Sequence, residues 1–220
     1  MWIDISRPIE EGMAVYKNRK NKQPRIEIQS CYHETGINES AIFLNLHTGT
    51  HMDAPYHRLP HGKTIDAVDP TLFIGPCRVI DLSALERRIE AEDLSPHHIQ
   101  KGECILLRTR NSLEEEYSPS FICLLPSAAD YLRHIGIRGV GIDAMSVERD
   151  DPAHPVHEIL LNAGIGILED IRLKNVKAGD WEIMAIPLRL SGRDASPCRA
   201  LLFPPSTRTD LPLPEEAQEP

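Results

Sequence analysis

Four side chains that can bind a metal or move a proton lie within eleven residues of this 220-residue chain. They are His47, His51, Asp53 and His57, in the segment HTGTHMDAPYH. Imidazole and carboxylate groups are ligands that zinc and manganese accept, and a metal held by them can generate hydroxide at neutral pH. The segment therefore predicts a metal site, and hydrolysis is the first hypothesis for its chemistry.

The spacing of these side chains predicts a curled backbone. All four lie at odd positions, so a straight strand would direct them to one face. At about 3.3 Å per residue, however, His47 and Asp53 would lie roughly 20 Å apart in a strand. Both must approach an ion to about 2.0–2.2 Å. Gly49 permits strained dihedrals and Pro55 cannot extend a central strand, so both residues favour a curl.

A helix is the alternative local geometry, in which His47 and His51 would share one face as in H-E-x-x-H metalloproteases. We reject the helix because Gly49, two threonines and Pro55 all disfavour it. In addition, Thr48 stands where such a protease has its glutamate.

Composition and charge limit the classes of function. The 24 basic and 33 acidic residues give a net charge of −9, which would repel nucleic acids and anionic membrane surfaces. We therefore expect a small-molecule partner, with no nucleic acid and no membrane. The five cysteines are spread singly, as free thiols in a reducing compartment would be. With no signal peptide or run of roughly 20 apolar residues, the cytoplasm is the expected location.

Alternating strand and helix patterns predict a single α/β domain with a mixed sheet and flanking helices over residues 1–204. The apolar run 41–46 is expected to be a buried strand that leads into the histidine cluster. The Pro-rich, acidic residues 205–220 are expected to be a disordered or peripheral tail. The other expected strands are 2–6, 25–29, 77–82, 104–109, 139–143, 166–169 and 181–188, and the expected helices are 85–92, 127–134 and a short one within 151–164.

Residues 17–25 contain five basic side chains and offer nothing apolar to bury. A solvated surface loop is the simpler interpretation of this composition. The sharper interpretation is a cationic lip over an anionic substrate.

The pattern H-x-G-T-H-x-D-x-P-x-H resembles the signature of the cyclase family of metal-dependent hydrolases, which includes bacterial kynurenine formamidase and isatin hydrolase. The resemblance continues through residues 62–66, through 140–143 with Ser146, and through 192–199. It therefore covers nearly all of residues 1–204. It implies a swivelling β/β/α fold that assembles as a homodimer or homotetramer.

The resemblance also implies roles for individual residues. His47, His51 and Asp53 match the ligands of a first metal, and Asp53 could bridge to a second. The second set of ligands is matched by His157 and Glu169, one in the expected short helix and one at the end of the next expected strand. His57 matches a catalytic histidine that transfers a proton to the leaving nitrogen after water attacks the carbonyl carbon. The ion would be Zn²⁺, with Mn²⁺ as the alternative, because the ligand set suits both.

The function implied is hydrolysis of an arylformamide or a cyclic amide. Two alternatives stay open: a lyase or dehydratase in which His57 abstracts a proton, and a metal-binding protein without catalysis. In the family, Val-Tyr is often followed by Pro-Gly-Asp, whereas here Val15 and Tyr16 precede Lys17. This departure predicts a different substrate pocket and favours an anionic substrate. Asp143 could orient a histidine, orient the substrate or serve as a structural cap.

Overall fold

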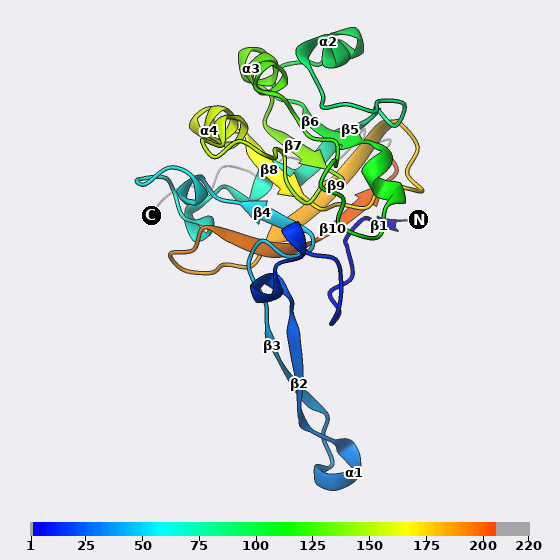
Figure 1. Ribbon diagram of the computed structural model, residues 1–220, viewed down its shortest axis with the longest axis vertical. Helices are drawn as coiled ribbons and strands as arrows, with labels where there is room; N and C mark the ends of the chain where they lie inside the picture. The colour runs from blue at the N-terminus through cyan, green and yellow to red at the C-terminus, as the bar shows by residue number, and fades with distance from the viewer. Residues whose placement is uncertain (1, 206–220) are drawn as a thin grey trace, which may run out of the picture.

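A closed ring of seven strands forms the centre of the protein in the computed structural model, which describes residues 2–205. The strand order is β10-β4-β8-β7-β6-β5-β9, and β9 pairs again with β10 to close the ring. Strands β5 to β8 are parallel neighbours and the other pairs are antiparallel. The predicted mixed α/β sheet with flanking helices is thus confirmed (Figure 1).

The elements are short and follow one another closely along the chain. The strands are β1 (Ile3–Asp4), β2 (Arg25–Ser30), β3 (Glu39–Phe43), β4 (His51–Asp53), β5 (Ile74–Asp81), β6 (Cys104–Arg108), β7 (Gly139–Ile142), β8 (Gly166–Glu169), β9 (Gly179–Pro187) and β10 (Ala195–Phe203). The α-helices are α1 (Tyr32–Thr35), α2 (Ala91–Leu94), α3 (Pro126–Ile135) and α4 (Pro155–Asn162). Single 3-10 turns are Tyr16–Asn18, Lys20–Lys22, Pro55–His57, Ile65–Ala67, Pro70–Phe73, Ser95–His97 and Arg110–Leu113.

Two hydrophobic cores lie on opposite faces of the parallel strands. On β6, Ile105 and Leu107 pack against the helices, whereas Cys104 and Leu106 pack inside the ring. Strand residues alternate between the two faces of a sheet, so an uninterrupted apolar strand such as β6 requires a core on each side. Helices α2, α3 and α4 cover the outer face (Figure 1). Burial on both faces holds the strand ends in fixed positions.

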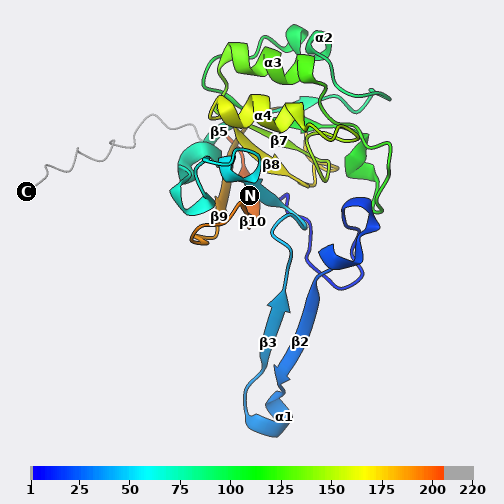
Figure 2. The same cartoon turned by 60° about the vertical axis from the view of Figure 1, so that its left-hand side comes forward.

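Strands β2 and β3 form a two-stranded ribbon that projects from the body and ends at α1 (Figure 2). We call residues 25–43 the arm. The expected buried strand 41–46 is wrong, because β3 ends at Phe43 and all five of its residues are exposed. Its apolar side chains lie on the arm, which the body does not cover.

Other expectations differ in detail. The helix expected at 85–92 is wrong, since most of that segment is loop and α2 begins at Ala91. Strand β10 was not expected. Of the expected tail 205–220, all but Pro205 lies outside the described residues. Within residues 2–205, no helix is long and apolar enough to cross a membrane.

Candidate metal centre

Strand β4 places two of the histidine-cluster residues inside the sheet. It lies between β8 and β10, and His51 is directly opposite Glu169 of β8. Opposite residues in a sheet share a face, so the two side chains meet, and Nε2 of His51 is 3.2 Å from Oε2 of Glu169. Asp53 is on the same face as His51, two residues further along β4. All three side chains are buried.

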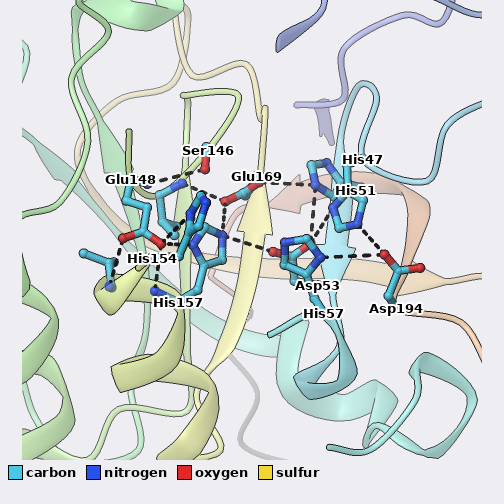
Figure 3. Close-up of polar contacts among 12 residues, drawn as sticks. His47, His51, Asp53, His57, Ser146, Glu148, His154, His157, Glu169 and Asp194 are labelled. Carbon is cyan, nitrogen blue, oxygen red and sulfur yellow. Dashed lines mark hydrogen bonds and ion pairs between the residues drawn. The ribbon is translucent and has the colours of Figure 1, made fainter. Parts of the chain in front are cut away.

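The backbone before β4 curls, as the spacing predicts. Gly49 has a φ of +72°, which an L side chain rarely adopts, and it follows a turn at His47. The curl brings Nδ1 of His47 to 3.0 Å from Oδ1 of Asp53. After β4, Pro55 opens a 3-10 turn that ends at His57. The four residues of the cluster are therefore gathered by a turn, a short strand and a second turn (Figure 3).

Helix α4 and strand β8 supply the two distant residues. Nε2 of His157 lies 3.4 Å from Oδ2 of Asp53 and 3.4 Å from Oε1 of Glu169. The other nitrogen of the same imidazole, Nδ1 of His157, contacts the carboxylate of Glu148. The structure thus brings His157 and Glu169 to the histidine cluster from a hundred or more residues away, around Asp53 (Figure 3).

Several acceptor atoms at this point have no hydrogen-bond partner. Both oxygens of Asp53 and Nε2 of His51 are buried without one, because the close approaches between them lack hydrogen-bond geometry. Nδ1 of His51 donates to the carbonyl of Gly49 at 2.8 Å, which leaves the Nε2 lone pair for another partner in the neutral ring. Buried polar atoms are normally satisfied, and a cation would satisfy all three of these. Imidazole nitrogens with carboxylate oxygens fit Zn²⁺ or Mn²⁺.

The electrostatics of the site are dominated by its two buried carboxylates. Burial opposes protonation of His51, yet Asp53 and Glu169 raise its pKa to about 10, so Nε2 holds a proton unless a bound cation takes the place of that proton. Burial also opposes ionisation of Asp53, but His47, His157 and His51 hold its pKa well below the usual value. Burial and the charge of Asp53 raise the pKa of Glu169, but the histidines outweigh them and lower it to about 2. Both carboxylates are therefore ionised at neutral pH, as metal ligands must be.

His57 lies at the edge of this group. Its ring centroid is 4.2 Å from that of His47 and 5.5 Å from that of His157, and its side chain is 28% exposed, against 4% or less for His51 and His157. Burial, with the nearby His47 and His157, lowers its pKa, so the ring is neutral at pH 7. A neutral, partly exposed imidazole can accept and donate a proton.

Two acidic residues at the site were not predicted. Glu148 contacts Nδ1 of His157, and Asp194, just before β10, accepts a hydrogen bond from Nε2 of His47 at 2.8 Å. The same Asp194 oxygen is 3.6 Å from Nδ1 of His57. Asp194 belongs to segment 192–199, so the family resemblance of that segment was the available signal. Glu148 gave none, because it precedes an irregular loop.

Asp143 does not reach the centre. Its two oxygens accept hydrogen bonds from the backbone and hydroxyl groups of Thr109 and Ser112, at 2.7–3.2 Å. Burial outweighs these bonds and raises its pKa to about 6. Of its predicted roles, the structural cap agrees with these contacts.

A sequence model of the cyclase family, described as putative cyclase, matches residues 3–149. The chain belongs to the cyclase family. Family relatives include the kynurenine formamidase of Bacillus cereus, which is 37% identical over 206 residues, 92% of this chain and 97% of that protein. The kynurenine formamidase of Bacillus anthracis is 36% identical over the same shares of both chains.

Two solved structures have the same fold as this chain. A "predicted metal-dependent hydrolase" from Bacillus stearothermophilus is 41% identical, with a TM-score of 0.85 over 92% of this chain and 97% of that one. Isatin hydrolase A from Labrenzia aggregata is 24% identical, with a TM-score of 0.80 over 94% of both chains. At that identity the second likeness shows the fold alone.

Proposed function

We propose that this chain is a metal-dependent hydrolase that cleaves a non-peptide amide bond, an arylformamide or a cyclic amide, in a small molecule. The observation that carries the proposal is the set of unpartnered, buried acceptor atoms of His51 and Asp53, beside a neutral histidine, His57. The kynurenine formamidases of the Bacillus relatives support the reaction class. The proposed catalytic domain is residues 1–204.

Five residues are proposed to hold the metal, with Asp53 between the two sets. Zn²⁺ is the proposed ion and Mn²⁺ the alternative. When bound there, either ion lowers the pKa of water and stabilises negative charge that develops on a carbonyl oxygen. The first set of ligands is His47, His51 and Asp53, and the second is Asp53, His157 and Glu169.

His57 is the proposed catalytic residue. Its neutral ring accepts a proton from the attacking water and passes it to the leaving nitrogen, so that an amine or an opened ring and a carboxylate are released. Asp194 lies close to Nδ1 of His57 and can keep that nitrogen protonated, which leaves Nε2 as the base. The buried carboxylates of Asp53 and Glu169 hold charge rather than move protons, because both pKa values are lowered.

The direct test measures metal content and turnover together. Purified protein is analysed for Zn and Mn and assayed on formamides, lactams and cyclic imides, with and without a chelator. We expect bound metal, and hydrolysis that the chelator abolishes and the metal restores. Turnover in ¹⁸O-labelled water should place one label in the carboxylate product, which a lyase reaction would not do. Hydrolysis unaffected by chelation would overturn the proposal.

A homodimer or homotetramer is the proposed assembly, with the arm as the contact. Ile26 and Ile28 of β2 alternate with polar residues, and Ile42 of β3 is paired with Ile26. Period-two alternation puts all three isoleucines on one exposed face. An isolated two-stranded ribbon is marginal in water, and a second copy of the same apolar face would cover it. The cytoplasm is the proposed location, because the five cysteines are free thiols.

A further inference from the structure

One of the five basic residues in the loop 17–25 is turned inward. Lys17, Arg19, Lys20 and Arg25 are exposed, as a solvated loop predicts, whereas Lys22 is half-buried. Long charged side chains normally extend into water, and burial lowers the pKa of this ammonium. The inward position of Lys22 therefore needs a reason beyond surface solvation.

The backbone at Lys22 is tied directly to the metal-binding loop. The hydroxyl of Thr48, the neighbour of His47, donates to the carbonyl of Lys22 at 2.8 Å. Thr48 is buried. The side-chain amide of Gln23 also donates to the carbonyl of Met13 at 2.9 Å. The position of Lys22 is thus set by backbone contacts that do not depend on its own side chain.

The side chain of Lys22 extends over the ring of Tyr16. Its Nζ lies 5.6 Å from the ring centroid of Tyr16, within cation–π range. Tyr16 in turn lines a narrow crevice together with His47 and His51. The carboxylates of Glu169, Asp53 and Asp194 are close enough to act on the pKa of Lys22 and partly offset its burial.

The charge of Lys22 is not taken up by an ion pair. Among residues 2–205, no carboxylate lies within 4.0 Å of its Nζ. The two buried carboxylates of the centre, Asp53 and Glu169, would be neutralised by one divalent ion. With that ion bound, Asp194 is the carboxylate that still acts on Lys22, and it forms no ion pair with the ammonium, so Lys22 can attract an anion to the crevice.

The ring of Tyr16 belongs to an aromatic group. Its centroid is 5.9 Å from that of Tyr117 and 6.2 Å from that of Phe121, both in edge-on geometry. Aromatic rings favour such offset and edge-on contacts, so a further aryl group can join them at little cost. An aromatic surface and an ammonium thus lie side by side next to the crevice.

We propose that Lys22 and Tyr16 form a subsite for the carboxylate and ring of an anionic aromatic substrate, with Lys22 as the residue that selects the charge. The inference rests on the proposed hydrolase function and names its substrate class. It assigns the anion preference to Lys22 because this lysine is half-buried. The Nζ of Lys17 also lies near the Tyr16 ring, 5.2 Å from its centroid, but Lys17 is exposed.

The test compares two arylformamides that differ in charge. N-Formylanthranilate carries a carboxylate beside the formamide, and formanilide does not. Lys22→Met removes the charge but keeps the apolar stem over Tyr16. We expect its KM for N-formylanthranilate to rise about tenfold, because one charge-assisted contact is lost. Its KM for formanilide should change less than about twofold. Lys22→Arg keeps the positive charge, so its KM for N-formylanthranilate should stay close to the wild-type value. Lys20→Met, in the same turn but exposed, is the matched control and should behave as wild type.

Calorimetry with anthranilate separates this inference from the function on which it rests. Anthranilate should bind the metal-loaded wild type more tightly than aniline does, and Lys22→Met should remove that preference. If neither formamide nor any lactam or cyclic imide is hydrolysed, the hydrolase proposal fails while anthranilate binding still decides the role of Lys22. An equal rise in KM for both formamides in Lys22→Met, or no rise for either, would overturn the subsite.

Discussion

Glu148 and His157 are joined by a short contact from Nδ1 of the imidazole to the carboxylate, and this contact directs Nε2 at Asp53 and Glu169. Glu148 also accepts the backbone N–H of Val156 at 2.9 Å, so the same carboxylate fixes the first turn of α4. A carboxylate behind a metal-binding histidine sets its tautomer and its orientation. Glu148 is therefore a positioning residue for the second set of proposed ligands.

Replacing Glu148 with Gln should weaken metal binding about tenfold or more, since the amide orients His157 less well and lowers its basicity. Competition with a chromophoric chelator measures this affinity. Glu158→Gln is the control, because Glu158 is on the same helix but exposed. An unchanged affinity in Glu148→Gln would mean that His157 is not a ligand.

His57→Ala should reduce kcat by about 10²–10⁴, the usual contribution of a general acid–base group. Metal content should stay at the wild-type level, because the other five residues remain. Steady-state kinetics and metal analysis of the same preparation check both statements. Loss of metal together with activity would assign His57 to the ligands instead.

Metal binding should stabilise the fold, because the ion binds a site that only the folded chain assembles. At an ion concentration of about 100 times Kd the gain is about 2.7 kcal/mol, or a rise in Tm of roughly 5–10 °C for a chain of this size. Differential scanning calorimetry with and without Zn²⁺ measures it. Asp53→Asn should remove the rise, since Asp53 belongs to both ligand sets.

Asp143→Asn should destabilise the protein by about 2–3 kcal/mol, because the amide group would face N–H and hydroxyl donors of Thr109 and Ser112. Urea unfolding measures the loss. Asp180→Asn, on exposed sheet surface, is the control and should change stability by less than about 0.5 kcal/mol. Metal affinity should be unaffected, since Asp143 does not reach the centre.

Ile28→Asp should convert the proposed oligomer to a monomer, because a charge on the apolar face of the arm cannot be buried unpaired. Ile28 is 72% exposed, so the folded chain should tolerate the change. Light scattering coupled to size-exclusion chromatography gives the mass of each form. Glu27→Asp, on the other face of β2, is the control. A wild-type monomer at assay concentrations would contradict the assembly.

Local pattern was sufficient for much of the fold. The parallel strands β6, β7 and β8 are mostly apolar runs, a pattern that predicts buried strands. Helix α3 begins with proline and ends before Gly136, a pattern that predicts a helix. The curl between His47 and Asp53 was predictable because ligand distances exclude a strand.

Pairing between strands that lie far apart in the sequence could not be predicted from local pattern. Strand β10 was missed because Pro197 and Cys198 interrupt its apolar alternation, and its strand character comes from pairing with three other strands. The apolar run 41–46 predicts a core strand because apolar strands usually lie in the core, whereas the arm exposes residues 41–43. Glu148 reaches His157 through an irregular loop that no periodicity describes.

The closing of the ring by β10 has a consequence for the order of assembly during synthesis. Strand β4 carries His51 and Asp53, but its two neighbours, β8 and β10, are both encoded far later in the chain. Contacts of such high sequence separation form slowly. The histidine cluster therefore leaves the ribosome long before its partners do, and β4 lacks one of its two neighbouring strands until β10 has been translated.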